Sequence, residues 1–461
     1  MKAIVRKISA LVLSISLVMS FAGVANASEV GYSYSDSDLA GFILADAIET
    51  IVADYNGDID YDKLIKAALH GMSNVLDENS AYLETADFEE FIADIKPTRL
   101  MFGIVFQKLS DGKIRIRQIY DGSSAIDVGL KIGDILVSAN GTSVAGMTVM
   151  EAIEEINKIK GNVANVVFSR DDKEMKVALE KRELVNKTVF IYKIEDILDN
   201  KDLKETANMR LVQLSAVGEN SDEEMKAAIE ELKAQGVTKI ILDLRGNAGG
   251  DFEVGINLCK MLVSKGAVLS KIEGDNRVRT YYSVQEKAPF DEIVVLVDGY
   301  TASAAEMIAA CLKDKGSAIV GQQTYGKASI QTVYYTYEGS FKLTTGEYLS
   351  PLGAKVNKIG IAPTVKVDMP EFLNYTLETS SADIGQVKKL LAFCGYEVGS
   401  INETYDDAAK AAVIKAKTDR GLEATEKIDI YVKDAFNDMY IEVLEQKDFM
   451  LEVAYNHMFK K

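Results

Sequence analysis

The amino-acid sequence predicts a multidomain α/β protein. Its 461 residues are enough for two to four domains, because a single hydrophobic core stops growing at about 250–300 residues. Hydrophobic residues make up 48% and charged residues 26% of the chain, which is typical of globular proteins. The hydrophobic pattern changes three times along the chain, from helical to strand-like, then to an alternation of both, and finally to mainly helical. These changes indicate domains of different construction.

The amino terminus predicts a secretory signal peptide. Three basic residues precede an apolar stretch from Ile8 to Val24, and Ala25-Asn26-Ala27 then forms a small-x-small cleavage pattern. We therefore expect residues 1–27 to be removed after Ala27 and the protein to work outside the cytoplasmic membrane. The alternative is an uncleaved membrane anchor, since the apolar stretch is at the short limit for a membrane span.

The next two regions differ in the spacing of their apolar residues. In residues 36–97, apolar residues recur at helical spacing, which predicts an N-terminal helical region. In residues 99–183, β-rich runs such as KIRIRQI (113–119) and VANVVFS (163–169) dominate. One predicted helix, at 148–159, interrupts them. The second region is therefore expected to be a small β-rich domain.

The remaining chain is predicted to contain two further domains. Residues 186–370 alternate strand-like and helix-like segments, which indicates α/β layering. The tail that starts at Pro370 is mainly helical in pattern, so residues 375–461 are expected to form a helical C-terminal domain.

Composition excludes several functions. The formal net charge of −18 makes the chain a poor candidate for binding nucleic acid, whose affinity comes from neutralising phosphates. Two histidines and three cysteines cannot build a His-rich metal site, and neither CxxC nor HExxH occurs, so we expect no metal or cofactor. Cys259, Cys311 and Cys394 lie in separate apolar runs and are predicted to be free thiols.

The first candidate segment is ILDLRGNAGG (241–250), in which an apolar strand runs into a glycine-rich turn before a helix. Glycines at such a turn let backbone N–H groups face a ligand closely. Gly249 and Gly250 fit either an oxyanion hole or a phosphate cradle, although the spacing of nucleotide-binding motifs is absent. The simplest alternative is a tight turn that needs positive φ.

The second candidate is Ser303, at a predicted strand–turn–helix junction. Ser303 and Glu306 fit a capping box, so Ser303 could serve only as a helix N-cap. A serine at such a rigid corner is also suited to be a nucleophile. The backbone amide of Ala304 would then point to where an oxyanion forms.

The third candidate is the segment TYGKASIQTVYY (324–335), whose composition favours the start of a strand. Lys327, among bulky neighbours, could lose enough water to be neutral and accept a proton. Gln331, four residues later, could share its face and orient the amine by hydrogen bonding. The alternative is a surface lysine on an edge strand.

The ordered set of segments resembles the carboxyl-terminal processing peptidases. The similarity covers residues 36–370 and includes GMSNVLDENSAYL (71–83), SSAIDVGLKIGDILVSANGTSV (123–144), LDLRGNAGG, TASAAE and YGKASIQ. This resemblance implies a Clp-protease/crotonase-like core (186–370) with an inserted PDZ domain (99–183). It also implies a serine endopeptidase with Ser303 as nucleophile, Lys327 as general base and Gln331 as the residue that orients it.

The resemblance assigns backbone groups as well. Oxyanion donors would be the amides of Ala304 and of Gly249 or Gly250. In the PDZ domain, the amides of Phe102-Gly103-Ile104 would bind a substrate's terminal carboxylate, and β-augmentation would align its tail. The chain departs from the family at Met101, where glycine is usual, and at Ala248, where proline is usual.

The function implied is an exported serine endopeptidase that cleaves proteins near their C-termini, with the PDZ domain recognising the tail and gating the site. The alternative is a catalytically silent scaffold that binds protein C-termini and cell wall. Residues 385–439 loosely resemble a peptidoglycan-binding module, but a helical docking or dimer element fits equally well. A homodimer, with residues 36–97 as its dimerisation region, is expected.

Overall fold

The computed structural model describes residues 35–93, 96–109, 112–198, 203, 206–273, 277–336, 339–373 and 381–459. The predicted signal peptide lies outside these residues. The chain divides into two compact units, Met1–Leu69 and His70–Lys461. Among the described residues, no helix combines the length and the apolar character needed to cross a membrane.

The first unit is helical where it is described. Helix α2 (Asp36–Asp54) begins with a capping box, in which the Ser35 hydroxyl accepts the N–H of Asp38 and the Asp38 carboxylate accepts the N–H of Ser35. Helix α3 (Tyr61–Ser73) begins in this unit and ends in the second. The helical spacing in the sequence therefore corresponds to observed helices here.

The second unit contains the end of α3, a short strand and the β-rich region, which forms a six-stranded sheet. After β1 (Ala81–Leu83) and α4 (Thr85–Ala93), the sheet has the order β3-β4-β5-β7-β8, with β6 paired to β5. Its strands are β3 (Ile104–Lys108), β4 (Ile114–Ile119), β5 (Ile135–Ala139), β6 (Thr142–Ser143), β7 (Val163–Arg170) and β8 (Lys173–Glu180). Two helices belong to this region, α5 (Ser124–Asp127) and α6 (Val149–Asn157). A separate pair, β2 (Thr98–Met101) and β9 (Arg182–Val185), joins the two ends of the region. Because β3 lies at the edge of the sheet, it can accept an added strand.

A second six-stranded sheet lies between the layers of the α/β region. Its order is β10-β11-β12-β15-β16-β19, and within it only β10 runs antiparallel to its neighbour. The strands are β10 (Val189–Tyr192), β11 (Met209–Leu214), β12 (Lys239–Asp243), β15 (Glu292–Val297), β16 (Ala318–Gly321) and β19 (Val365–Lys366). The continuous apolar run of β15 is typical of a parallel strand that is buried on both faces.

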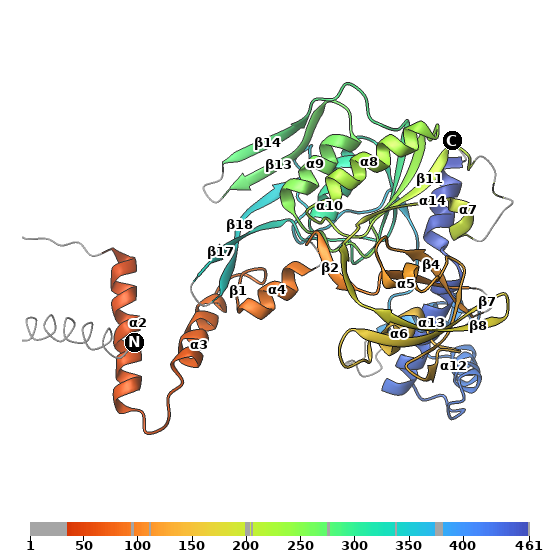
Figure 1. Cartoon of the computed structure of the whole chain (residues 1–461), viewed down its shortest axis with the longest axis horizontal. Helices are drawn as coiled ribbons and strands as arrows, with labels where there is room; N and C mark the ends of the chain where they lie inside the picture. The colour runs from red at the N-terminus through yellow and green to blue at the C-terminus, as the bar shows by residue number, and fades with distance from the viewer. Residues whose placement is uncertain are drawn as a thin grey trace, which may run out of the picture. The chain divides into compact units, whose positions relative to one another are not determined.

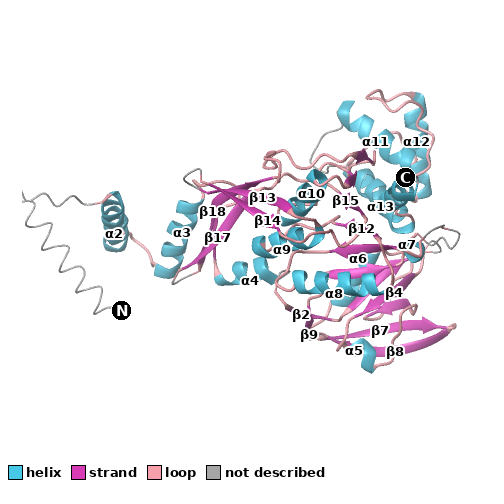
Figure 2. Cartoon of the chain, turned by 90° about the horizontal axis from the view of Figure 1, so that it is seen from above, coloured by secondary structure: helices cyan, strands magenta, loops and turns pink. Residues whose placement is uncertain are grey.

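Helices cover both faces of this parallel sheet (Figure 1). One layer consists of α8 (Ser221–Ala234), α9 (Phe252–Leu262) and α10 (Ala304–Asp314). The other comes from the C-terminal helices α11 (Ser381–Phe393), α12 (Asp407–Asp419), α13 (Ile430–Gln446) and α14 (Phe449–Phe459), of which Figure 2 shows α11, α12 and α13 together. In β12, Ile240 packs in the cluster with α9 and α10, whereas Ile241 packs with Leu451 of α14. The C-terminal helices therefore share a hydrophobic core with the sheet.

A third sheet is entirely antiparallel and carries the predicted base segment. It has the order β1-β18-β13-β14, and β17 pairs with β18. Its further strands are β13 (Gly266–Glu273), β14 (Val278–Ser283), β17 (Ser329–Tyr335) and β18 (Ser340–Leu349). Because β17 starts at Ser329, Lys327 lies just before the strand, and a register shift at Ile330/Gln331 marks a bulge in it.

Candidate active site

Ser303 sits in a strained turn between β15 and α10. It is the N-cap residue of α10, and its φ of +54° with ψ of −123° is a conformation that side chains other than glycine rarely adopt. Neighbouring hydrogen bonds hold the turn: the amide of Ala302 donates to the carbonyl of Asn247 at 2.9 Å, and the Tyr348 hydroxyl donates to the carbonyl of Ser303 at 2.7 Å. The geometry is that of a turn that presents a nucleophile.

Glu306 joins this turn to the segment that carries Lys327. Its carboxylate is fully buried and accepts the N–H of Ser303 at 3.0 Å, the predicted capping contact. The same carboxylate also accepts the N–H groups of Gly326 at 2.7 Å and of Lys327 at 2.8 Å, and the hydroxyl of Thr324 at 2.5 Å. One buried charge therefore orders the backbone of both candidate residues. The capping spacing indicated the first contact, and nothing in the sequence indicated the others.

Within the described part of the chain, the amine of Lys327 has no acceptor. Among the described residues, its Nζ makes neither a hydrogen bond nor an ion pair. Burial lowers the pKa of Lys327, and the nearby cation of Lys342 lowers it further. Because Glu306 binds the backbone of Lys327 instead of its ammonium, no carboxylate offsets these two effects.

Gln331 is held by its amide nitrogen. Nε2 donates to the Ser329 hydroxyl at 2.8 Å and to the Thr344 hydroxyl at 3.3 Å. Thr344 in turn donates to the carboxylate of Asp77 at 2.9 Å. This anchoring leaves the side-chain carbonyl oxygen of Gln331 without a hydrogen bond in the described part of the chain, so it can accept one from an amine. The sequence did not identify Thr344 or Asp77 as part of this arrangement.

The structure distinguishes the two candidate glycines. A Cβ at Gly249 would lie 2.7 Å from the Cβ of Ser303 and 2.8 Å from the amide nitrogen of Ala304, so only glycine fits there. However, the N–H of Gly249 already donates to the Asn247 side chain at 2.8 Å. Within the described residues, the N–H groups of Gly250 and Ala304 make no hydrogen bond. Gly250 and Ala304 are therefore better placed than Gly249 to bind an oxyanion.

These predicted residues share one cavity of about 440 Å³. It is lined by Ser303, Ala304, Lys327, Gln331, Gly249 and Gly250, together with further residues that include Lys342 and Tyr348. Across the described residues, no hydrogen bond joins the Ser303 hydroxyl to the Lys327 amine. Hydrogen bonds of this kind are often long without substrate and shorten when it binds. The arrangement provides a nucleophile, a desolvated amine and two N–H donors in one space.

The predicted tail-binding loop lies in a second cavity of about 590 Å³. Phe102 and Gly103 connect β2 to β3, and Gly103 has a φ of +70°. This cavity is lined by Phe102, Gly103 and Ile104, by Ile153 and Ile156 of α6, and by Ala248 and Gly249. The last two also line the Ser303 cavity, so the two spaces adjoin at the glycine-rich turn.

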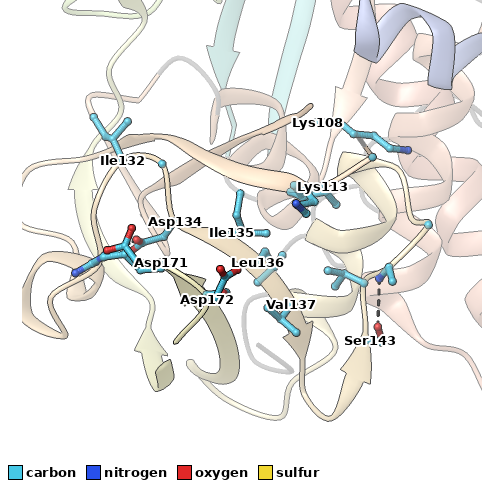
Figure 3. Close-up of a pocket in the computed structure, with 18 of the residues that line it drawn as sticks. Lys108, Lys113, Ile132, Asp134, Ile135, Leu136, Val137, Ser143, Asp171 and Asp172 are labelled. Atoms are coloured by element: carbon cyan, nitrogen blue, oxygen red, sulfur yellow. Dashed lines mark hydrogen bonds and ion pairs between the residues drawn. The ribbon is translucent and has the colours of Figure 1, made fainter. Parts of the chain in front are cut away.

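A third cavity, of about 1010 Å³, contains none of the predicted site residues. Figure 3 shows Asp134, Asp171 and Asp172 toward one end of it and Lys108 and Lys113 toward the other. Among the described residues, no group of three or more His, Cys, Asp or Glu side chains could hold a metal ion. Cys259, Cys311 and Cys394 are free thiols, as predicted; the first two are buried, whereas Cys394 is half-buried.

Two family models match parts of this chain. Residues 208–367 match Peptidase family S41, and residues 92–167 match the PDZ domain. The first match contains Ser303 and Lys327, and the second contains the Phe102–Ile104 loop.

The chain is also similar to individual proteins. It is 29% identical to the carboxy-terminal processing protease CtpA of Bacillus subtilis (strain 168), over 90% of this chain and 89% of that protein. It is 26% identical to a probable CtpA-like serine protease of Staphylococcus aureus (strain N315), over 88% of this chain and 82% of that protein. Among solved structures, the photosystem II D1 C-terminal processing protease is 26% identical, with a TM-score of 0.42, over 74% of this chain and 90% of that one. Residues 208–367 thus form a region of Peptidase family S41 and residues 92–167 a PDZ region, and the chain is a serine peptidase that is similar to carboxy-terminal processing proteases.

Proposed function

We propose that this protein is an exported endopeptidase that cleaves substrates near their C-termini through Ser303 and Lys327, with Gln331 orienting the lysine. The observation that carries the proposal is the environment of Lys327: a half-buried amine that has no acceptor among the described residues and lies in the cavity that Ser303 also lines. A desolvated, unpaired lysine is the state in which an amine can act as a general base near neutral pH.

The proposed reaction is acyl transfer. Neutral Lys327 takes the proton of the Ser303 hydroxyl as its oxygen attacks the scissile carbonyl, which forms a tetrahedral intermediate. The N–H groups of Ala304 and Gly250 stabilise its oxyanion; loss of one such donor lowers the rate about 10²–10³-fold. Lys327 then protonates the leaving amine, and water hydrolyses the acyl-enzyme with Lys327 again acting as base.

The PDZ domain would select the substrate. A peptide that adds to the edge strand β3 would place its terminal carboxylate at the amides of Phe102, Gly103 and Ile104. Since Ala248 and Gly249 line both cavities, the preceding part of the chain could continue toward Ser303. We propose that occupation of this groove also gates the site, by favouring the form in which the Ser303 hydroxyl and the Lys327 amine make contact.

The proposal also covers the export, the domain architecture and the oligomeric state of the protein. We infer a signal peptide cut after Ala27, a Clp-protease/crotonase-like core at 186–370 and a homodimer formed through 36–97. For residues 375–461, the hydrophobic core shared by α14 and the parallel sheet favours a docking element over an independent peptidoglycan-binding module. Sequencing the amino terminus of the secreted protein and measuring its mass by sedimentation test the first and third of these inferences.

A second candidate function is a scaffold that binds protein tails without cleaving them. It is favoured by one observation: among the described residues, the Ser303 hydroxyl and the Lys327 amine make no hydrogen bond. Incubating the mature protein with an unstructured polypeptide that has an apolar C-terminus, between pH 6 and 9, separates the two functions. The peptidase should release products, and Ser303→Ala and Lys327→Ala should abolish their release. An amidated C-terminus should weaken tail binding. Binding without any product would favour the scaffold.

A further inference from the structure

Asp448 of the C-terminal segment forms an ion pair with Arg245, the residue directly before the glycine-rich turn. Nη1 of Arg245 donates to Oδ1 of Asp448 at 2.6 Å, and Nη2 donates to Oδ2 at 2.7 Å. On its other side, the same guanidinium binds Asp243 through Nε at 2.8 Å and Nη2 at 2.7 Å. Two carboxylates from distant parts of the chain, Asp243 and Asp448, therefore fix the plane of one guanidinium.

The ion pair is largely buried. The side chains of Arg245 and Asp448 are each 21% exposed, and that of Asp243 is 5% exposed. Although burial favours the neutral acid, Arg245 holds the pKa of Asp448 below its ordinary value. Arg117 of β4 interacts electrostatically with this cluster, since Asp243 and Asp448 both favour the charged form of Arg117. The charge of Asp448 therefore lies where three regions of the chain meet.

Asp448 is held from its own side by the helix that follows it. It precedes α14, and its Oδ1 accepts the N–H of Leu451 at 2.9 Å. Leu451, Ala454 and Met458 of α14 are fully buried in the cluster that includes residues of the parallel sheet. The carboxylate is therefore a fixed contact point and not the end of a mobile side chain.

From Arg245, a continuous series of contacts leads to the nucleophile turn. The N–H of Gly246 donates to both carboxylate oxygens of Asp298 at 3.1 Å. Asn247 is fully buried, and its carbonyl accepts the N–H of Ala302, next to Ser303, at 2.9 Å. Its side chain accepts the N–H of Gly249, which fixes the turn that ends at Gly250. A shift of Arg245 would therefore move the groups proposed to bind the oxyanion.

We propose that Asp448 is a positioning residue for the peptidase reaction: it holds Arg245, and through Arg245 the Gly246–Gly250 turn, in the geometry needed for catalysis. This inference rests on the proposed function, because it assigns the turn to the oxyanion site. It gives the helical C-terminal segment, which lies outside the residues that match Peptidase family S41, a role in the reaction at Ser303.

The test compares Asp448→Asn with a matched control in the full mature protein. Asn keeps the size of the side chain and an oxygen that can accept the N–H of Leu451, but it removes the charge that Arg245 needs. The control is Glu442→Gln, which breaks the two-point ion pair with Arg420 inside the C-terminal segment. Asp448→Glu restores the charge and should recover part of the activity.

The substrate is the unstructured polypeptide with an apolar C-terminus. For Asp448→Asn we expect kcat to fall about 10–100-fold with little change in KM, because misplacement of catalytic groups by about 1 Å can have effects of this size. Glu442→Gln should leave kcat within about twofold of the wild-type value, since it changes no contact of the turn. Equal losses in both variants, or a loss of thermal stability in Asp448→Asn with an unchanged kcat of the folded protein, would overturn the proposal.

A second measurement does not depend on cleavage. Hydrogen–deuterium exchange of the peptide that spans Arg245–Asp251 should be faster in Asp448→Asn than in the wild type and unchanged in Glu442→Gln. Exchange that is equal in all three proteins overturns the positioning role. Wild-type protein that cleaves nothing, together with faster exchange in Asp448→Asn alone, supports the contact between the segments and counts against the peptidase mechanism, so the two failures can be distinguished.

Discussion

Lys327, which is half-buried, and Lys388, which is buried, occupy opposite environments. Lys388 of α11 is 1% exposed, and its ammonium donates to Asn402 Oδ1 at 3.0 Å, to the carbonyl of Thr404 at 3.0 Å and to Asp406 Oδ2 at 2.9 Å. Lys327 is only half-buried, yet its amine has no such acceptor within the described residues. Lys388 holds a loop through three acceptors, whereas the lowered pKa of Lys327 favours loss of its proton.

The difference lies in what the nearest carboxylate binds. Asp406 accepts directly from the ammonium of Lys388, and this contact lowers the pKa of Asp406. Glu306 instead accepts the backbone N–H of Lys327 and so fixes the position of the residue without stabilising its cation. Partial burial with an anchored backbone and a free amine is therefore a better indication of a base than burial alone.

The sharpest test of this comparison replaces Lys327 by Met. Cleavage should fall by at least about 10³-fold, as for the loss of other catalytic bases, and Ser303→Ala should have a similar effect. Because burial disfavours the Lys327 cation, the folded protein should gain stability as pH rises through the lowered pKa toward the value of the unfolded chain. Lys327→Met removes this penalty, so its melting temperature near pH 7 should equal or exceed that of the wild type. A clearly lower value would show that the lysine is structural.

The next test concerns Glu306. In Glu306→Gln, an amide that carries its own N–H donors faces the N–H groups of Ser303, Gly326 and Lys327, so at least one contact must be lost. We expect kcat to fall about 10²-fold, because both catalytic groups would shift. Steady-state kinetics measure the change in kcat, and a thermal melt measures the loss of stability from the lost contact. An unchanged kcat would mean that the contacts of Glu306 do not position Ser303 and Lys327.

Lys388→Met should show the opposite behaviour. It removes the ammonium from the Thr404 carbonyl and from Asp406, while Asn402 Oδ1 keeps only the N–H of Thr404, and we expect the free energy of unfolding to fall by about 2–4 kcal/mol. The kcat of the folded fraction should stay close to that of the wild type. The neighbouring Lys389, whose partner Asp368 is exposed, provides the control, and Lys389→Met should cost less than about 1 kcal/mol. Urea titration compares the two, and equal losses would contradict the structural role of Lys388.

The smallest expected effect is on the pH profile. If neutral Lys327 is the base, kcat/KM should rise with pH through the lowered Lys327 pKa and then level off. Lys342→Gln removes a neighbouring cation, so the Lys327 pKa should increase and the midpoint of the profile should move to higher pH. Lys355→Gln, at an exposed lysine, should leave the midpoint in place. A midpoint that moves to lower pH in Lys342→Gln would have the wrong sign for this mechanism.

Much of the candidate site could be predicted from local pattern. The strand–turn–helix junction at Ser303 and the glycine-rich turn at 246–250 are short-range features, because turn chemistry and helix capping depend on residues within a few positions. Most helices and strands could be predicted for the same reason, although β1 interrupts a region predicted to be helical. The choice between Gly249 and Gly250 could not be made, since it depends on where the Asn247 side chain points.

Residue order alone was therefore sufficient for the succession of helices and strands, for the family resemblance and for the identity of the candidate nucleophile and base. Folding of distant segments onto one another was needed for the second role of Glu306, for the anchoring of Gln331 by Thr344 and Asp77, and for the pairing of Arg245 with Asp448. Backbone periodicity and turn preferences act over a few residues and leave a repeating signal in the sequence. Hydrogen bonds between packed elements join residues at arbitrary separations in the sequence, so no regular spacing predicts them.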